Sequence, residues 1–239
     1  MAAAGPIIAH RGASAQKPEN TIAAFEAAHA AGCRWIELDA QVLDDGGVIV
    51  MHDHTFDRTT NGAGPVAMSN MATVRALRTR DPQTGDLTDE GIPTLSSAIE
   101  LCAETGLGLI LEIKATWGID ADDARAVGDL LPASPEFPIM VTSFSVTALR
   151  TVSQTRPDID LGLASLRPPR DPSAVKAALG LSAIHCNAEW TTAQDISAMH
   201  AAGLDVAIAT INDAEMARRF LQDGADGIMT DWPRLLDAD

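Results

Sequence analysis

The sequence predicts an α/β protein of the (β/α)8 TIM-barrel class, with a small insertion after the second barrel strand. Short apolar runs alternate with helix-like stretches along the whole chain. When one hairpin strand is set aside, eight such runs remain, and eight parallel strands with crossover helices close into a barrel. The length of 239 residues suits a single domain, 1–239. A doubly wound open sheet is the alternative, because periodicity alone does not distinguish it from a barrel.

The predicted strands are apolar runs bounded by polar or turn residues. In chain order they are Pro6–His10, Trp35–Val42, Val48–His52, Leu107–Lys114, Pro138–Phe144, Ile159–Ala164, Ala183–Asn187, Leu204–Ile211 and Gly227–Thr230. The sequence DDGG at 44–47 is a hairpin-turn signal. Residues 48–52 are therefore expected to pair antiparallel with 35–42 or to extend it, and not to form a barrel strand.

Helices are predicted between these strands, at Thr21–Ala31, Leu95–Glu104, Asp122–Leu131, Val146–Gln154, Pro172–Leu179, Ala193–Ala202 and Asp213–Gln222. Asn20, Ser145 and Asn212 directly precede three of them and are expected to cap those helices. Residues 53–92 break the alternation and are rich in Gly, Thr, Asn and Asp. We expect this segment to be an insertion over one end of the barrel.

Charge and composition narrow the classes of function. The chain carries 17 Lys and Arg against 33 Asp and Glu, a net charge of −16. Such a field repels nucleic acid and anionic membranes, and no apolar run reaches the roughly 18 residues that span a bilayer. An anionic substrate would need local cations, such as a metal ion. Cysteines are few and scattered, at Cys33, Cys102 and Cys186, and no secretory signal is expected at the N-terminus. We therefore expect a reducing, cytoplasmic location.

Three acidic residues mark a candidate metal site. Glu37 and Asp39 lie two positions apart on the second predicted strand, and Glu112 lies on the next barrel strand. Side chains two apart on a strand share a face, so these carboxylates are expected to lie together. Buried carboxylates repel one another unless a cation compensates them. An all-oxygen ligand set suits Mg²⁺, Ca²⁺ or Mn²⁺ better than Zn²⁺.

Two histidines and two cationic residues complete the predicted active site. His10 and His52 end strands and can supply a general acid and a general base, since imidazole titrates near neutral pH. Arg11 and Lys114 suit phosphoryl oxygens. Together with the metal site, they predict metal-assisted cleavage of a phosphate ester. The other histidines are expected to be structural, with His54 near the site but without a role: His29, His54, His185 and His200.

An ordered set of motifs spans about residues 5–233. It comprises HRG (10–12), PENT (18–21), AF (24–25), IELD (36–39), DGG (45–47), HD (52–53), RTTNG (58–62), IPTL (92–95), EIK (112–114), SF (143–144) and GADGIMTDWP (224–233). In this set the sequence closely resembles the glycerophosphodiester phosphodiesterase family, which implies a TIM barrel with an inserted segment after its second strand.

The resemblance also implies an activity and roles for residues. It implies hydrolysis of a glycerophosphodiester, such as glycerophosphocholine or glycerophosphoethanolamine, to an alcohol and sn-glycerol 3-phosphate, within lipid and glycerol metabolism. Water or the vicinal glycerol hydroxyl would attack first. The implied roles are Mg²⁺ or Ca²⁺ binding by Glu37, Asp39 and Glu112, acid/base catalysis by His10 and His52, phosphate binding by Arg11 and Lys114, and support of the site by Glu19 and Asn20.

One departure from the family pattern concerns the substrate pocket. A WTVN-like motif is usual on the seventh barrel strand, and here Ala209 replaces its tryptophan. Trp117 or Trp190 could form the pocket rim in its place, and each is equally plausible as a packed aromatic residue. This departure leaves the identity of the substrate open, but not the phosphodiesterase chemistry. Three alternatives stand independently of it: a lysophospholipase D-like or sphingomyelinase D-like enzyme, a barrel that binds a phosphorylated ligand without turnover, and an unrelated barrel aldolase or isomerase.

Overall fold

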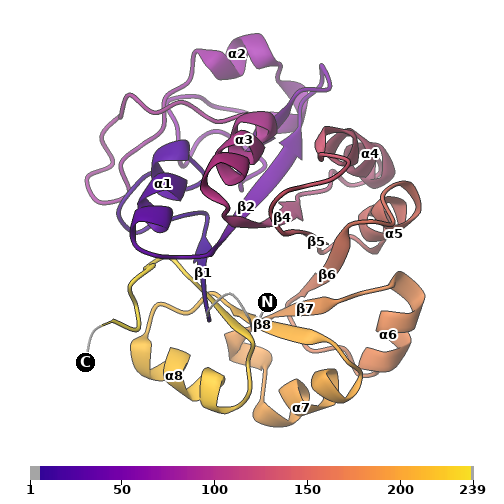
Figure 1. Ribbon diagram of the computed structural model, residues 1–239. Coiled ribbons are helices and arrows are strands. Elements are labelled where there is room, and N and C mark those ends of the chain that lie inside the picture. Colours follow the sequence, from indigo (N-terminus) through magenta and orange to yellow (C-terminus); the bar gives the residue numbers. More distant parts are fainter. Residues whose placement is uncertain (1–5, 238–239) are drawn as a thin grey trace.

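The computed structural model describes residues 6–237 and confirms the predicted TIM barrel. Residues 1–5, part of the N-terminal stretch in which no secretory signal is expected, lie outside the described residues. Eight parallel strands follow one another in the order β1-β9-β8-β7-β6-β5-β4-β2, and pairing between β1 and β2 closes the ring. Helices surround this ring on the outside (Figure 1).

All the predicted strands are present, with modest changes at their ends. They are β1 (Ile7–His10), β2 (Trp35–Val42), β3 (Val48–Val50), β4 (Gly108–Ile113), β5 (Ile139–Ser143), β6 (Asp160–Ser165), β7 (Ala183–Asn187), β8 (Asp205–Ala209) and β9 (Gly227–Thr230). The short β3 pairs antiparallel with β2, as the turn at 44–47 predicts, and takes no place in the ring.

The predicted helices are also present: α1 (Ile22–Ala30), α3 (Leu95–Thr105), α4 (Asp120–Leu130), α5 (Val146–Thr155), α6 (Pro172–Leu179), α7 (Ala193–Ala201) and α8 (Ala214–Gln222). No helix within residues 6–237 is long and apolar enough to cross a membrane. Ser145 caps α5 as predicted, but Thr21 caps α1 and Asp213 caps α8. The predicted caps Asn20 and Asn212 were wrong, because both amides bind carboxylates instead.

The barrel interior is apolar toward the amino ends of the strands. One cluster there consists of Ile8, Trp35, Ile110, Met140, Ala183, Ala207 and Met229. A larger cluster fills the space between the strands and the surrounding helices. Burial of a whole Ile or Leu side chain stabilises the folded state by about 1.5–3 kcal/mol relative to leaving it exposed. This apolar layer packs beneath the polar residues at the carboxyl ends of the strands.

The insertion lies between β3 and α3 and has a small core. It contains the short 3₁₀ helix η2 (Val66–Met68) and α2 (Met71–Arg75), at the top of Figure 1. This core is shared with the β2–β3 hairpin, which contributes Leu43 and Ile49 to a cluster with Met51, Phe56, Val66 and Val74. The first residues of this segment follow His52 directly, so the insertion forms one side of the region where the predicted site residues gather.

Candidate active site

The predicted catalytic, metal-binding and phosphate-binding residues lie together at the carboxyl ends of the strands. They line one pocket, which we call the inner pocket: His10, Arg11, Glu37, Asp39, His52, Glu112 and Lys114. The same pocket extends across the barrel to residues of β5 to β8 and has a volume of about 170 Å³. An adjoining, more open space of about 740 Å³, the outer cleft, is lined by residues 52–55, 112–115 and 143–145.

The three acidic residues form a compact cluster that is short of positive charge. One oxygen from each of Glu37, Asp39 and Glu112 lies within 4.8 Å of the others. Burial, reinforced by the neighbouring Asp39, raises the pKa of Glu37 to about 8 and also raises the pKa of Glu112. A cation would relieve this repulsion, and carboxylate oxygens are the ligands that hard divalent cations prefer. The donor set therefore fits the metals predicted from sequence.

The Asp39 carboxylate is held by a hydrogen bond and two cationic side chains. The Asn20 amide donates to its Oδ2 at 2.8 Å, Lys114 Nζ lies 3.0 Å from its Oδ1, and Arg11 Nε lies 3.2 Å from its Oδ2. Burial by itself would raise the pKa of Asp39, but Lys114 and Arg11 bring that pKa down to about 2. Lys114 also forms an ion pair with Glu112. Asn20 thus contacts a carboxylate of the acidic cluster, and its supporting role in a working site stays a prediction.

The loop after β1 adopts an uncommon backbone conformation to make these contacts. Arg11 and Asn20 have positive φ angles of 56° and 58°, a region that costs non-glycine residues of the order of 1 kcal/mol or more. In this conformation the Arg11 backbone N–H donates to Glu37 Oε2 at 3.1 Å. Backbone strain at non-glycine residues is typical of functional sites, and here it directs two side chains and one amide toward the carboxylate cluster.

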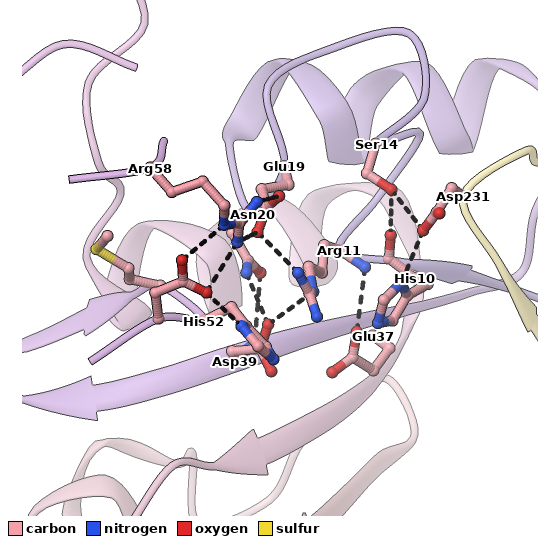
Figure 2. A network of polar contacts seen from close by, with 12 residues as sticks. His10, Arg11, Ser14, Glu19, Asn20, Glu37, Asp39, His52, Arg58 and Asp231 are labelled. Atoms are coloured by element: carbon pink, nitrogen blue, oxygen red, sulfur yellow. Dashed lines mark hydrogen bonds and ion pairs between the residues drawn. The ribbon is translucent and has the colours of Figure 1, made fainter. Parts of the chain in front are cut away.

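His10 is oriented by a residue from the other end of the chain. Its Nδ1 lies 2.7 Å from Asp231 Oδ1, and the Ser14 hydroxyl donates to the same oxygen at 3.0 Å (Figure 2). Pairing of β1 with β9 brings these residues together. Burial lowers the pKa of His10, but Asp231 and the nearby carboxylates outweigh it, and the net pKa is raised. Engagement of Nδ1 leaves Nε2 for chemistry.

His52 has an equivalent carboxylate partner. Its Nδ1 lies 2.7 Å from Asp53 Oδ1, and Arg58 Nε donates to Asp53 Oδ2 at 2.6 Å. Arg58 also donates to Glu19 at 2.6 Å, and Glu19 accepts from Arg11 at 2.8 Å, so one ionic chain joins both sides of the pocket (Figure 2). Burial is the main cause of the lowered pKa of His52. Glu19 therefore orients groups around the site rather than facing the pocket.

Three residues that hold the two histidines in place were not among the site residues predicted from sequence: Asp231, Asp53 and Arg58. Each lies inside a quoted motif, in GADGIMTDWP, HD or RTTNG, so the signal was present. Spacing alone could not show which carboxylate meets which histidine, because His10 and Asp231 are 221 positions apart.

The two candidate rim tryptophans lie outside the walls of both spaces. Trp117, in the loop after β4, is 96% exposed, and Trp190 is 45% exposed with the Arg167 guanidinium 4.0 Å from its ring centre. Ala209 itself lines the inner pocket, so that position presents only a methyl group. A role for either tryptophan with substrate stays a prediction.

His185 differs from the prediction of a satisfied structural residue. It is only 6% exposed on β7 and lines the inner pocket, and its Nε2 has no hydrogen-bond partner among the described residues. Burial lowers the pKa of His185 to about 4, so the ring is neutral at pH 7. His200, in contrast, is paired with Asp226 at 2.8 Å, and His54 lines the outer cleft.

Comparison with known proteins decides the family. Residues 10–235 match the model of the glycerophosphoryl diester phosphodiesterase family. The chain belongs to this family. It is 32% identical over 237 residues to the glycerophosphodiester phosphodiesterase of Caldanaerobacter subterraneus subsp. tengcongensis, covering 96% of this chain and 95% of that protein. The family resemblance predicted from the ordered motifs is thereby confirmed.

Solved structures of similar proteins share the fold along nearly the whole chain. The phosphodiesterase of Oleispira antarctica, in complex with the product sn-glycerol-3-phosphate, is 30% identical with a TM-score of 0.91, covering 98% of this chain and 96% of that one. The glycerophosphodiester phosphodiesterase of Agrobacterium tumefaciens is 28% identical with a TM-score of 0.80, covering 98% and 99%. The family's TIM-barrel architecture is therefore common to all three proteins.

Proposed function

We propose that this protein hydrolyses glycerophosphodiesters, such as glycerophosphocholine or glycerophosphoethanolamine, to an alcohol and sn-glycerol 3-phosphate with the help of a divalent cation. One observation carries the proposal: two imidazoles, each held by its own carboxylate at 2.7 Å, line the same pocket as a cluster of three acidic side chains. Family membership and the product-bound Oleispira structure support the same substrate class.

Glu37, Asp39 and Glu112 would hold the cation. When bound, Mg²⁺, Ca²⁺ or Mn²⁺ supplies positive charge that stabilises a phosphoryl group under attack. Arg11 and Lys114, which line the same pocket, add cationic charge for the phosphoryl oxygens. Because the Asp39 carboxylate already contacts both cationic side chains, their positions are fixed before substrate arrives.

The two histidines would move the protons of the reaction. With Nδ1 of each ring bound to a carboxylate, Nε2 of one ring can take a proton from the attacking hydroxyl or water. Nε2 of the other can give a proton to the leaving alcohol oxygen. Asp231 and Asp53 fix the orientation of His10 and His52 and stabilise their protonated forms.

Release of glycerol 3-phosphate tests this function. The protein is incubated with glycerophosphocholine or glycerophosphoethanolamine and Mg²⁺, Ca²⁺ or Mn²⁺, and release is coupled to glycerol-3-phosphate dehydrogenase. We expect cation-dependent release, reduced by roughly 10²–10⁴ in His52→Ala. His29→Ala is the control, because His29 is exposed on α1 and lines neither the inner pocket nor the outer cleft, so this variant should retain turnover. The absence of release with every metal and head group would refute the proposal.

Lysophospholipids are a second substrate class, favoured by one observation. Phe144 and Leu166, which line the inner pocket, are 53% and 64% exposed, and the neighbouring loop carries the exposed Trp117. Such apolar surface beside a phosphate site could receive an acyl chain. Comparison of long-chain lysophosphatidylcholine with glycerophosphocholine separates the two classes. Higher kcat/KM for the deacylated diester would exclude a lysophospholipase D-like preference.

A further inference from the structure

We propose that His185 binds a hydroxyl group of the glycerol moiety, which makes the inner pocket the glycerol site of the enzyme. The inference rests on the proposed function, since it assigns the substrate's glycerol end within the same site. His185 was expected to be structural from sequence, and the proposal follows from its position, its neighbours and its unsatisfied nitrogen.

His185 lies across the barrel from the acidic cluster. In the ring, β1, β9 and β8 separate β7 from β2 on one side, and β4, β5 and β6 separate them on the other. Strand β7 therefore faces β2, which carries Glu37 and Asp39. Asn187, two positions after His185, also lines the inner pocket, as the alternation of side chains along a strand requires. The pocket thus has an acidic wall and, opposite it, a neutral polar wall.

The residues beside His185 leave room and provide no partner. In the sheet register His185 pairs with Ala164 on β6 and with Ala207 on β8, while Asn187 pairs with Ala209. Ala164 and Ala209 also line the inner pocket. Their methyl groups are small and cannot hydrogen-bond to the imidazole.

The chemistry of the ring selects the ligand group. A buried nitrogen without a hydrogen-bond partner costs free energy. A polar group of a ligand in the inner pocket, which His185 lines, can supply that partner. Burial keeps the imidazole uncharged, so it offers one donor and one acceptor. A hydroxyl group is likewise both donor and acceptor. The charge of the phosphate would be neutralised by Arg11 and Lys114 on the opposite side of the pocket.

The sizes of the two spaces agree with this assignment. The inner pocket, about 170 Å³, suits the small glycerol moiety that all substrates of this class share. The outer cleft, about 740 Å³, is open enough for alcohols of different size. His52, Glu112 and Lys114 line both spaces. The phosphorus atom would lie at this junction, with glycerol on the His185 side and the leaving alcohol in the cleft.

A comparison of two substrates tests the inference. We measure kcat/KM for glycerophosphocholine and for bis(p-nitrophenyl) phosphate, a diester without hydroxyl groups, in wild type, His185→Phe and His185→Asn. The preference for glycerophosphocholine should fall about tenfold in His185→Phe, mainly through KM, and recover partly in His185→Asn, which retains a hydrogen-bonding group. The inhibition constant of sn-glycerol 3-phosphate should rise by a similar factor in His185→Phe, and that of inorganic phosphate should rise less.

His29→Asn is the control, because it removes a histidine from the exposed surface of α1. Its substrate preference should equal that of wild type. If His185→Phe is folded and keeps both the wild-type preference and the wild-type affinity for sn-glycerol 3-phosphate, the inference is overturned and His185 has only a structural role in the pocket wall. If wild type itself releases no glycerol 3-phosphate, the proposed function fails instead, independently of His185.

Discussion

The buried imidazole of His185 should make the stability of the protein depend on pH. Burial lowers its pKa from 6.5 to about 4 in the folded state, whereas the unfolded chain binds the proton near pH 6.5. The unfolded state therefore takes up the proton first as pH falls, and stability decreases from pH 6.5 down to about pH 4. The full effect is about 3 kcal/mol, of which about 2 kcal/mol appears between pH 7 and pH 5. Replacement by Phe removes this effect.

Urea unfolding of the metal-free protein at pH 5, 6 and 7 measures this pH dependence of stability. The free energy of unfolding of His185→Phe relative to wild type should increase by about 2 kcal/mol from pH 7 to pH 5. Every other titrating group is common to both proteins and cancels in the difference. A constant difference between His185→Phe and wild type across this range would refute the reasoning.

Three further predictions concern the site and its support. When Mg²⁺ or Ca²⁺ is added to EDTA-treated wild type at a hundred times its Kd, the free energy of unfolding should increase by about 3 kcal/mol, as measured by thermal unfolding. Glu37→Gln should lose most of this increase. An equal increase in both proteins would contradict the metal assignment. Arg58→Ala should lower kcat about tenfold with little change in KM, because the carboxylate that orients His52 loses its partner; steady-state kinetics with an unchanged kcat would show that this ion pair is dispensable. Gly12→Ala should cost about 2 kcal/mol or more in urea unfolding, because its φ is 79° and the new Cβ would lie 2.6 Å from the Ala24 carbonyl carbon; wild-type stability would contradict that close approach.

The strands could be predicted from sequence because each apolar run ends at turn or polar residues, whereas closure of the ring had a doubly wound open sheet as its alternative. The position of Glu37, Asp39 and Glu112 on neighbouring strands followed from the same pattern. Helix caps were less predictable. Asn20 and Asn212 have the right residue type and nearly the right position, but each amide is engaged by a carboxylate at the site. Local propensity was therefore overridden by a tertiary contact.

The sequence could not show which residues far apart in the chain contact one another at the site. Asp231 and His10 meet only because the ring closes, and Arg58 joins Asp53 to Glu19 only through the path of the insertion. The unsatisfied nitrogen of His185 is a similar case. An isolated histidine on a strand usually finds a partner, and only the alanines on both sides of it in the folded sheet reveal that this one does not.

If His10 transfers a proton as proposed, its contact with Asp231 makes catalysis a reporter of complete folding. His10 lies on β1, and Asp231, whose carboxylate orients it, follows β9, next to β1 in the ring. A nascent chain that has folded up to β8 would contain the entire acidic cluster and both imidazoles. It would still lack the group that orients His10, so a partly assembled barrel could bind a cation well before it could turn over substrate efficiently.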